Sequence, residues 1–183
     1  MQKQSVINID HSINSGQVFL WERIQNTWYG INGHDVLSIS EKPFKMSSFT
    51  HDSLDFFRED DDFSEIIQSI SKDKIVRDAA KRYPGLRLLR QDTFQCYISF
   101  IVSSNSNIQK IRYALEELCK KFGKEIDFDE KKFYLFPEPE TLENASIKEL
   151  ERCGLGYRAK SVKEASTAVV KGQINFEIGR AHV

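Results

Sequence analysis

The chain has 183 residues, of which 40% are hydrophobic, and its formal net charge is −1. This is enough apolar material for one large domain or two small ones with a sizeable core, and the net charge neither favours nor excludes a nucleic-acid partner. Three cysteines without a C-x-x-C spacing argue against a zinc site or a redox pair. No apolar run is long enough to span a membrane and no signal peptide opens the sequence, so we expect reduced cysteines and an intracellular protein.

Short runs rich in aromatic and β-branched residues predict strands in the first part of the chain. These runs are Val18–Gln25, Trp28–Ile31, Val36–Ser40 and Phe44–Phe49. Asn32-Gly33, between two of the runs, is the strongest short signal for a hairpin. Because the predicted strands follow one another closely, we expect them to form an antiparallel meander.

Helical character begins after the strands, in a segment whose charge changes sign along the chain. Residues 52–65 are acidic, and residues 72–90 are basic. Short helices are predicted over Asp61–Ile70 and Lys72–Arg82, before the break at Pro84-Gly85. The basic segment is either a phosphate-binding face or a solvated helix face, and the second explanation is the more common one for such a segment alone.

Arg90–Gly123 organises the chain as two helices joined by a polar corner. Phe94–Val102 is almost entirely apolar, which predicts a buried helix. Apolar residues recur at helical spacing through Ile108–Phe122, and charged residues lie on the opposite face. Gly123 is the expected stop of this second helix, in the left-handed conformation that glycine adopts readily.

The corner consists of small polar residues, Ser103–Asn107, and these are more than a turn requires. Capping is one explanation, because Ser and Asn side chains accept hydrogen bonds from the free N–H groups at a helix start, and Asn107 is well placed as an N-cap. The alternative is that Asn105 projects from a rigid corner into a partner. The corner alone favours capping, so the rest of the chain has to decide.

Beyond the second helix we expect a proline-containing loop and then two more helices. Ser146–Glu149 is a capping box that opens a short helix ending at Gly154, and a longer helix is predicted over Tyr157–Lys171. The chain has no motif of a phosphate-binding loop, a zinc protease or a serine hydrolase. Residue chemistry alone therefore indicates no nucleophile and no general base.

Three motifs stand out together, and they are Ser15–Trp21, Arg90–Asp92 with Ser103–Ile108, and Gly154–Lys160. Each motif alone is weak evidence. In this order and at these separations they resemble the 8-oxoguanine DNA glycosylase family, and the resemblance extends over nearly the whole chain, from residue 6 to residue 176.

The resemblance implies an α+β fold. Residues 1–90 would form an N-terminal antiparallel β domain like a repeat of the TATA-binding protein, and residues 91–176 the truncated start of an all-helical glycosylase domain with a helix-hairpin-helix. Residues 177–183 break the helical pattern, and the last six are those that a widely used sequencing adaptor would encode in this frame. We interpret this tail as not native.

The resemblance also implies a function. Enzymes of this family flip oxidised guanine out of duplex DNA, which costs about a few kcal/mol of unstacking. A lysine amine then attacks the sugar and forms a Schiff base, which permits strand cleavage at abasic sites, and a nearby aspartate supports this chemistry. We therefore expect a monomeric base-excision repair protein of the cytoplasm, nucleoid or nucleus. Its partner would be double-stranded DNA with oxidised guanine opposite cytosine, and it would need no cofactor and no membrane.

Four residues match DNA-contacting positions of that family. Gly16 matches a glycine whose carbonyl accepts from N7–H of oxidised guanine, a bond worth roughly 1–3 kcal/mol in discrimination, although a tight bend is its simpler role. Asn105 matches an asparagine that fills the gap left by the flipped base, and the full pattern favours this role over capping. Tyr157 matches a wedge beside the orphaned cytosine, and Arg158 an arginine that hydrogen-bonds this cytosine.

The sequence also departs from the family pattern. Lys110 stands where a second arginine commonly reads the cytosine, and because lysine lacks the planar fork we expect relaxed selectivity for the opposite base. Leu20 and Ser106 replace an arginine and an asparagine. The hairpin, the catalytic lysine and the catalytic aspartate of the family are expected after the last predicted helix, and Lys160 and Lys163 do not fit that motif. We assign no catalytic residue and expect the chain by itself to be inactive.

Two other classes of function remain open on the sequence. One is a non-enzymatic module that binds damaged DNA, and the other is a β-plus-helix interaction domain with no nucleic-acid role. Binding that weakens as salt is added separates DNA binding from the interaction domain, because phosphate contacts release counterions.

Overall fold

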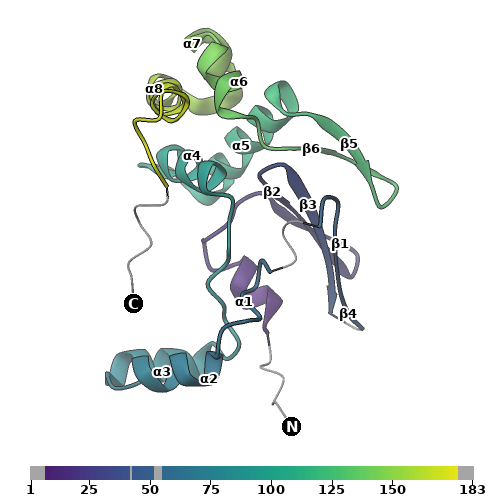
Figure 1. Ribbon diagram of the computed structural model, residues 1–183, viewed down its shortest axis with the longest axis vertical. Coiled ribbons are helices and arrows are strands. Elements are labelled where there is room, and N and C mark those ends of the chain that lie inside the picture. Colours follow the sequence, from purple (N-terminus) through teal and green to yellow (C-terminus); the bar gives the residue numbers. More distant parts are fainter. Residues whose placement is uncertain (1–6, 42, 52–54, 177–183) are drawn as a thin grey trace.

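The computed structural model describes residues 7–41, 43–51 and 55–176, and Figure 1 shows how their helices and strands are arranged. A four-stranded sheet lies beside a group of helices, and a pair of helices projects at the opposite end of the molecule. The tail predicted over 177–183 and residues 52–54 of the acidic segment lie outside the described residues. Within the described ranges, no helix has both the length and the apolar character needed to cross a membrane.

The sheet follows the order of the chain, β1-β2-β3-β4, through antiparallel pairs, and this confirms the predicted meander. The strands are β1 (Trp21–Ile24), β2 (Thr27–Asn32), β3 (Asp35–Glu41) and β4 (Phe44–Ser48). β1 begins three residues later than the predicted Val18 start, because the chain before it turns. A short helix for which the sequence shows no clear signal, α1 (Ile9–Ile13), precedes this turn.

Each face of the sheet contributes buried side chains to its own apolar cluster. Trp28 and Ile39 form a cross-strand pair in the cluster that includes the apolar side chains of α1. Tyr29 and Ile31 lie on the opposite face, in the cluster formed with the later helices. Successive side chains of a strand point to opposite faces of the sheet, so a strand with consecutive apolar residues contributes to the cluster on each face.

The tip of the β2–β3 hairpin holds the start of α4 (Thr93–Ser103). The N–H of Gly33 donates to Oε1 of Gln95 at 2.7 Å, and Nε2 of Gln95 donates to the Ile31 carbonyl at 2.9 Å. The N–H of Asp92 donates to Oδ1 of Asn32 at 2.7 Å, and the Asp92 carboxylate caps α4. Gly33 has a φ of +61° and a Cβ there would lie 2.7 Å from the Asp92 carboxyl carbon, so the site requires glycine.

The later helices form the second part of the molecule. They are α5 (Ile108–Phe122), α6 (Pro139–Asn144), α7 (Ile147–Leu150), the irregular turn η1 (Glu151–Leu155) and α8 (Arg158–Val170). α8 packs against α4 and α6, η1 packs against α5, and the predicted capping box opens α7. The prediction of a wholly buried α4 is wrong for one face: Ile98 and Val102 are buried, but Phe100 is exposed. The described helices that contact α4 leave that side uncovered.

A second hairpin, formed by β5 (Glu125–Phe128) and β6 (Lys131–Tyr134), occupies part of the segment predicted as a loop. Asp129 and Glu130 form its turn with φ angles of +51° and +58°, the conformation that Asn-Gly normally signals. Phe133 stacks on Tyr29 with the ring centroids 5.5 Å apart, and the Tyr29 hydroxyl donates to the Asp129 carboxylate. Burial and this hydrogen bond raise the pKa of Tyr29 to about 12.

Gly123 follows α5 as predicted, but its conformation differs from the prediction. Its φ is −81° and its ψ is 161°, which is extended backbone and not the left-handed conformation. A Cβ at this position would lie 1.9 Å from the carbonyl oxygen of Leu135. The glycine is needed because the chain leaving β6 passes close to it, so the physical reason is close approach and not positive φ.

The projecting pair of helices, called the arm below, consists of α2 (Phe63–Ile70) and α3 (Lys74–Arg82), which begin two residues after the predicted helices. Neither helix contains a buried residue. Arg90 ties the chain at the base of the arm through ion pairs with Asp55 at 2.7 Å and with Asp60 at 2.9 Å. The domain boundary predicted after residue 90 stays a prediction.

Candidate functional site

The residues of the polar corner between α4 and α5 have different roles in the structure. Asn107 caps α5, as predicted, by accepting from the N–H of Lys110 at 2.9 Å. Asn105 has a φ of +48°, in the left-handed region that Asn tolerates better than most residues. Its side chain is exposed, and no described residue makes a hydrogen bond with its amide group. Capping therefore does not account for Asn105.

Arg158 connects the start of α8 to this corner. Its Nε donates to the Ser104 carbonyl at 2.8 Å, and its Nη2 donates to the carbonyls of Ser104 and Asn105, the latter at 2.9 Å. The guanidinium also lies over the ring of Tyr157, 4.6 Å from its centroid. These contacts join parts of the chain more than 50 residues apart and hold the backbone of Asn105 in place.

The turn between η1 and α8 depends on two glycines. Gly154 has a φ of +81° and Gly156 a φ of +54°. A Cβ on Gly154 would lie 3.0 Å from the ring of Tyr113, whereas a Cβ on Gly156 would meet open space. Between the two, Leu155 is fully buried at 0% exposure. The turn is therefore fixed to the core by one side chain while its backbone stays open to solvent.

These elements enclose a groove of about 630 Å³, the corner groove, to which α4, α5, η1 and α8 or their flanking turns all contribute. Asn105, Lys110 and Arg158 line it, so the structure brings together three of the residues singled out from the sequence. Tyr157 follows this turn directly with 69% of its surface exposed. Both charged residues of the lining are cationic, which suits the groove to an anion such as a DNA phosphate, and the open tyrosine ring offers a surface on which a base can stack.

Gly16 lies outside this groove, on the turn between α1 and β1. It is exposed with a φ of +87°, and no atom lies within 4 Å of the position where a Cβ would be. The tight bend is therefore a sufficient reason for glycine here. Phe19, which follows in the same segment, packs against Phe100 of α4 with the ring centroids 6.4 Å apart. That Gly16 faces the same partner as the corner groove stays a prediction.

Tyr113 is a lining residue that the sequence motifs do not indicate. It lies on α5, is exposed, and contacts the groove close to Gly154. Its sequence signal is weak but present, because an aromatic residue there falls off the apolar stripe of the helix, on the same side as the charged residues. An aromatic residue on the polar face of a helix is a candidate for a contact with a partner.

The two lysines of α8 considered as substitute nucleophiles are both engaged. Lys163 donates to the carbonyls of Glu143 and Ala145, the latter at 2.7 Å, and so holds the end of α6. Lys160 is exposed and pairs with Glu164 at 3.7 Å. An amine nucleophile is activated by desolvation or by a nearby cationic group. Lys163 is therefore occupied in a structural contact, and Lys160 lies open to solvent beside a carboxylate.

Two family models together match the whole chain. Residues 1–97 match the model described as 8-oxoguanine DNA glycosylase, N-terminal domain, and residues 98–183 match the HhH-GPD superfamily base excision DNA repair protein. A curated relative, the N-glycosylase/DNA lyase OGG1 of Arabidopsis thaliana, is 31% identical over 163 residues, which are 81% of this chain and 44% of the relative.

Solved structures of 8-oxoguanine glycosylases are also similar to this chain. The 8-oxoguanine glycosylase/lyase of Clostridium acetobutylicum, in complex with double-stranded DNA containing cytosine opposite to 8-oxoG, is 27% identical with a TM-score of 0.84. Its apo form is 27% identical with a TM-score of 0.85. Each match covers 94% of this chain, and 62% and 63% of the two solved chains. The chain thus spans less than half the length of the curated relative and under two thirds of the solved ones.

Proposed function

This chain belongs to the 8-oxoguanine DNA glycosylase family, and from that membership we propose that its corner groove binds duplex DNA containing oxidised guanine opposite cytosine. The observation that carries the proposal is the convergence of Asn105, Lys110 and Arg158 on one groove whose lining holds no carboxylate. We further propose that the protein acts inside the cell, in the cytoplasm, nucleoid or nucleus. We also propose that it works as a monomer and does not assemble with further copies of itself.

Arg158 is preorganised for its part in this function. A guanidinium carries five N–H donors in a rigid plane. The corner carbonyls accept from Nε and Nη2, and no described residue accepts from Nη1. The two N–H groups of Nη1 donate to the acceptor edge of the cytosine left without its partner. Because the guanidinium is already held, little side-chain entropy is lost on binding. Lys110 adds a positive charge but lacks the planar pair of N–H donors of a guanidinium, so the base opposite the lesion is recognised mainly by Arg158.

Asn105 and Tyr157 compensate for the loss of stacking when the lesion leaves the duplex. The amide of Asn105 is exposed and fills the vacated space with donors and acceptors for the groups left unpaired. The ring of Tyr157 is inserted beside the cytosine and replaces part of the lost stacking. Gly16 recognises the lesion through its backbone carbonyl, which accepts from N7–H of oxidised guanine and meets only an acceptor in guanine.

Binding of labelled duplexes tests the proposal. The chain should bind a duplex with oxidised guanine opposite cytosine more tightly than the same duplex with guanine, and the affinity of both should fall as salt is added. Asn105→Gly keeps the positive φ and removes only the amide, so we expect about a tenfold loss of affinity for the damaged duplex and little change for the undamaged one. Asn105→Ala adds backbone strain and should lose affinity for both. Affinity that does not change with salt would contradict DNA binding.

Removal of the oxidised base and cleavage at abasic sites are proposed for the whole protein, through the family's lysine chemistry. We propose no nucleophile within residues 7–176, since Lys163 holds α6 and Lys160 is exposed and paired with Glu164. Incubation of this chain with damaged duplex and borohydride should therefore trap no covalent adduct. An adduct that disappears when Lys160 and Lys163 are both replaced would show that the chain has its own nucleophile.

A further inference from the structure

The turn that carries Gly16 is attached to a distant segment of the chain by one side chain, that of Gln17. Its Nε2 donates to the carbonyl of Arg87 at 2.9 Å and to Oγ of Ser15 at 2.8 Å. Its Oε1 accepts from the N–H of Leu89 at 3.0 Å. Arg87 and Leu89 are both buried, and they lie 70 and 72 residues away in the chain. Gln17 therefore joins an exposed turn to the interior of the protein.

The other end of the turn is attached to the same segment. Oγ of Ser12, a fully buried residue, accepts from the N–H of Arg87 at 3.0 Å. Oγ of Ser15 donates to the Ser12 carbonyl at 2.7 Å and accepts from the amide of Gln17. The residues on the two sides of Gly16 are thus bonded to each other across the turn, and both ends of the turn are bonded to Arg87.

Gly16 itself supplies no restraint on this turn. Its φ is +87°, and beyond its chain neighbours no atom lies within 4 Å of the position where a Cβ would be, so packing does not hold it. Within the described ranges, no residue donates a hydrogen bond to its carbonyl. Because glycine has wide backbone freedom, the orientation of its peptide group depends on the residues around it. The carbonyl is therefore available to a ligand and is held only through its neighbours.

We propose that Gln17 is a positioning residue for lesion recognition, which keeps the carbonyl of Gly16 in the orientation that accepts from N7–H of oxidised guanine. The inference rests on the proposed function, in which this carbonyl recognises the lesion. Gln17 acts through the turn and not through a DNA contact of its own, because a Gln amide has two N–H donors and both are used within the protein. A carbonyl that is held before binding loses less entropy when it binds.

Gln17→Met tests the proposal, because Met has a similar length but cannot bond the backbone of Arg87 and Leu89. The measurement is the dissociation constant for labelled duplexes with oxidised guanine or guanine opposite cytosine, and the preference is the ratio of the two constants. The preference should fall by at least about fivefold in Gln17→Met. Affinity for the guanine duplex should stay within about twofold of the wild type, since phosphate contacts elsewhere supply it.

Gln95→Met is the matched control. The amide of Gln95 also bonds an N–H and a carbonyl of another segment, those of Gly33 and Ile31. This variant leaves both groups without a partner, so it should lower the melting temperature. It should not change the preference for oxidised guanine. If Gln17 had only a structural role, the two variants would behave alike.

Ser15→Ala and Ser69→Ala form a second pair, at exposed positions where the fold tolerates the change. Each substitution removes a hydroxyl that donates to the carbonyl three residues earlier. Only Ser15 also accepts from Gln17. The preference should fall in Ser15→Ala, by less than in Gln17→Met, and should not change in Ser69→Ala. This pair decides the question if Gln17→Met does not fold.

Hydrogen exchange follows the turn in the absence of DNA. Gln17→Met should increase exchange of the amide protons of residues 14–18 and leave that of α8 unchanged. Unchanged exchange in this turn would contradict a positioning role, whatever the DNA measurements give.

Three binding results would also overturn the inference. They are an unchanged preference in Gln17→Met, an equal loss of preference in Gln17→Met and Gln95→Met, and an equal loss of affinity for both duplexes in Gln17→Met. A preference that persists in Gln17→Met contradicts this inference alone. A wild-type chain that binds both duplexes equally contradicts the proposed function as well, because there is then no preference for Gln17 to support.

Discussion

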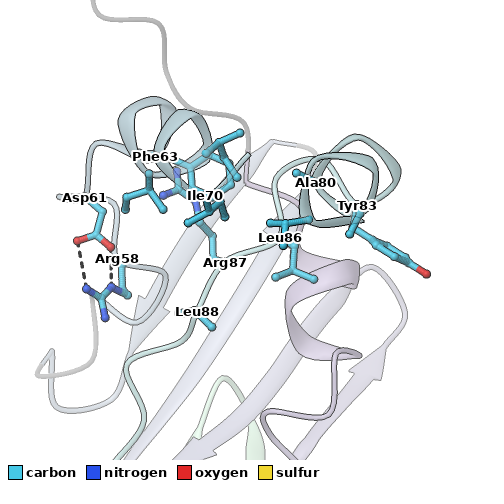
Figure 2. Close-up of a pocket in the computed structure, with 13 residues that line it drawn as sticks. Arg58, Asp61, Phe63, Ile70, Ala80, Tyr83, Leu86, Arg87 and Leu88 are labelled. Carbon is cyan, nitrogen blue, oxygen red and sulfur yellow. Dashed lines mark hydrogen bonds and ion pairs between the residues drawn. The ribbon is translucent and has the colours of Figure 1, made fainter. Parts of the chain in front are cut away.

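The corner groove and the apolar groove between α2 and α3, called the arm groove here and drawn in Figure 2, are built in opposite ways. The corner groove exposes polar side chains, but its backbone is attached to fully buried residues such as Leu155 and is joined by the hydrogen bonds of Arg158. The arm groove exposes apolar side chains, and neither of its helices contributes a buried residue. The corner groove therefore rests on the packed core, whereas the arm groove consists of apolar side chains that no described residue covers completely.

The difference lies in what each kind of surface requires of the chain beneath it. Reading a polar, charged ligand requires donors that are held in position before binding, since ordering them during binding costs entropy. Tight packing beneath the corner and the fork of Arg158 meet this requirement. An open apolar groove has no directional contacts to position, because the free energy gained when apolar surface leaves water does not depend on direction. Three mutational contrasts test the comparison.

The largest effect is expected from core truncation beneath the corner. Leu155→Ala removes a fully buried side chain and should lower the free energy of unfolding by about 3 kcal/mol. Ile66→Ala in the arm groove removes a side chain that is already exposed, so it should cost less than about 1 kcal/mol. Urea denaturation of both variants measures the difference. Equal costs would mean that the arm is as well packed as the corner.

An intermediate effect is expected at the link between α8 and the corner. Arg158→Lys keeps the charge but cannot bond the carbonyls of both Ser104 and Asn105 with one planar group, so it should cost about 1 kcal/mol of stability. It should also weaken binding of the damaged duplex about tenfold. Lys160→Gln on the same helix is the control and should leave stability unchanged. If Arg158→Lys binds the duplex normally, Arg158 acts only as a positive charge.

The smallest effect concerns acid stability. Hydrogen bonds from the N–H and the hydroxyl of Ser146 lower the pKa of Glu149 from its ordinary 4.5. The carboxylate therefore stabilises the fold above pH 4.5, and this contribution is lost as the pH falls through the lower pKa of the folded state. Thermal melts across this pH range should show a weaker dependence on pH for Glu149→Gln than for the wild-type chain.

Asp60→Asn provides the matched measurement at the arm. The hydrogen bond from Arg90 lowers the pKa of Asp60 in the same direction. Hydrogen exchange should show that the loss of this pair increases opening in the arm and leaves the corner protected. If both substitutions open both regions equally, the arm and the corner unfold as one unit.

Much of this fold could be predicted from local sequence patterns. The meander follows from short β-branched and aromatic runs, and the capping box of Ser146 with Glu149 is a four-residue signal that forms as predicted. The second hairpin could not be predicted, because Asp129 and Glu130 form a turn with positive φ at both positions without the usual Asn-Gly. Gly123 could be recognised as a helix stop, but its reason, the passing carbonyl of Leu135, is a contact between distant segments.

The sequence by itself determined the local elements and, through its motifs, the residues worth examining at the corner. Only the tertiary structure decided that Asn105 is exposed while Asn107 caps α5, that Arg158 bonds the corner backbone, and that Tyr113 completes the groove. The physical reason is the range of the interactions. Capping and amphipathic periodicity act between residues that are close in the chain and leave a repeating pattern in the sequence. Contacts such as that of Arg158 with Ser104 join residues 54 positions apart. A contact over this separation produces no periodic pattern in the sequence, so it cannot be predicted from local patterns.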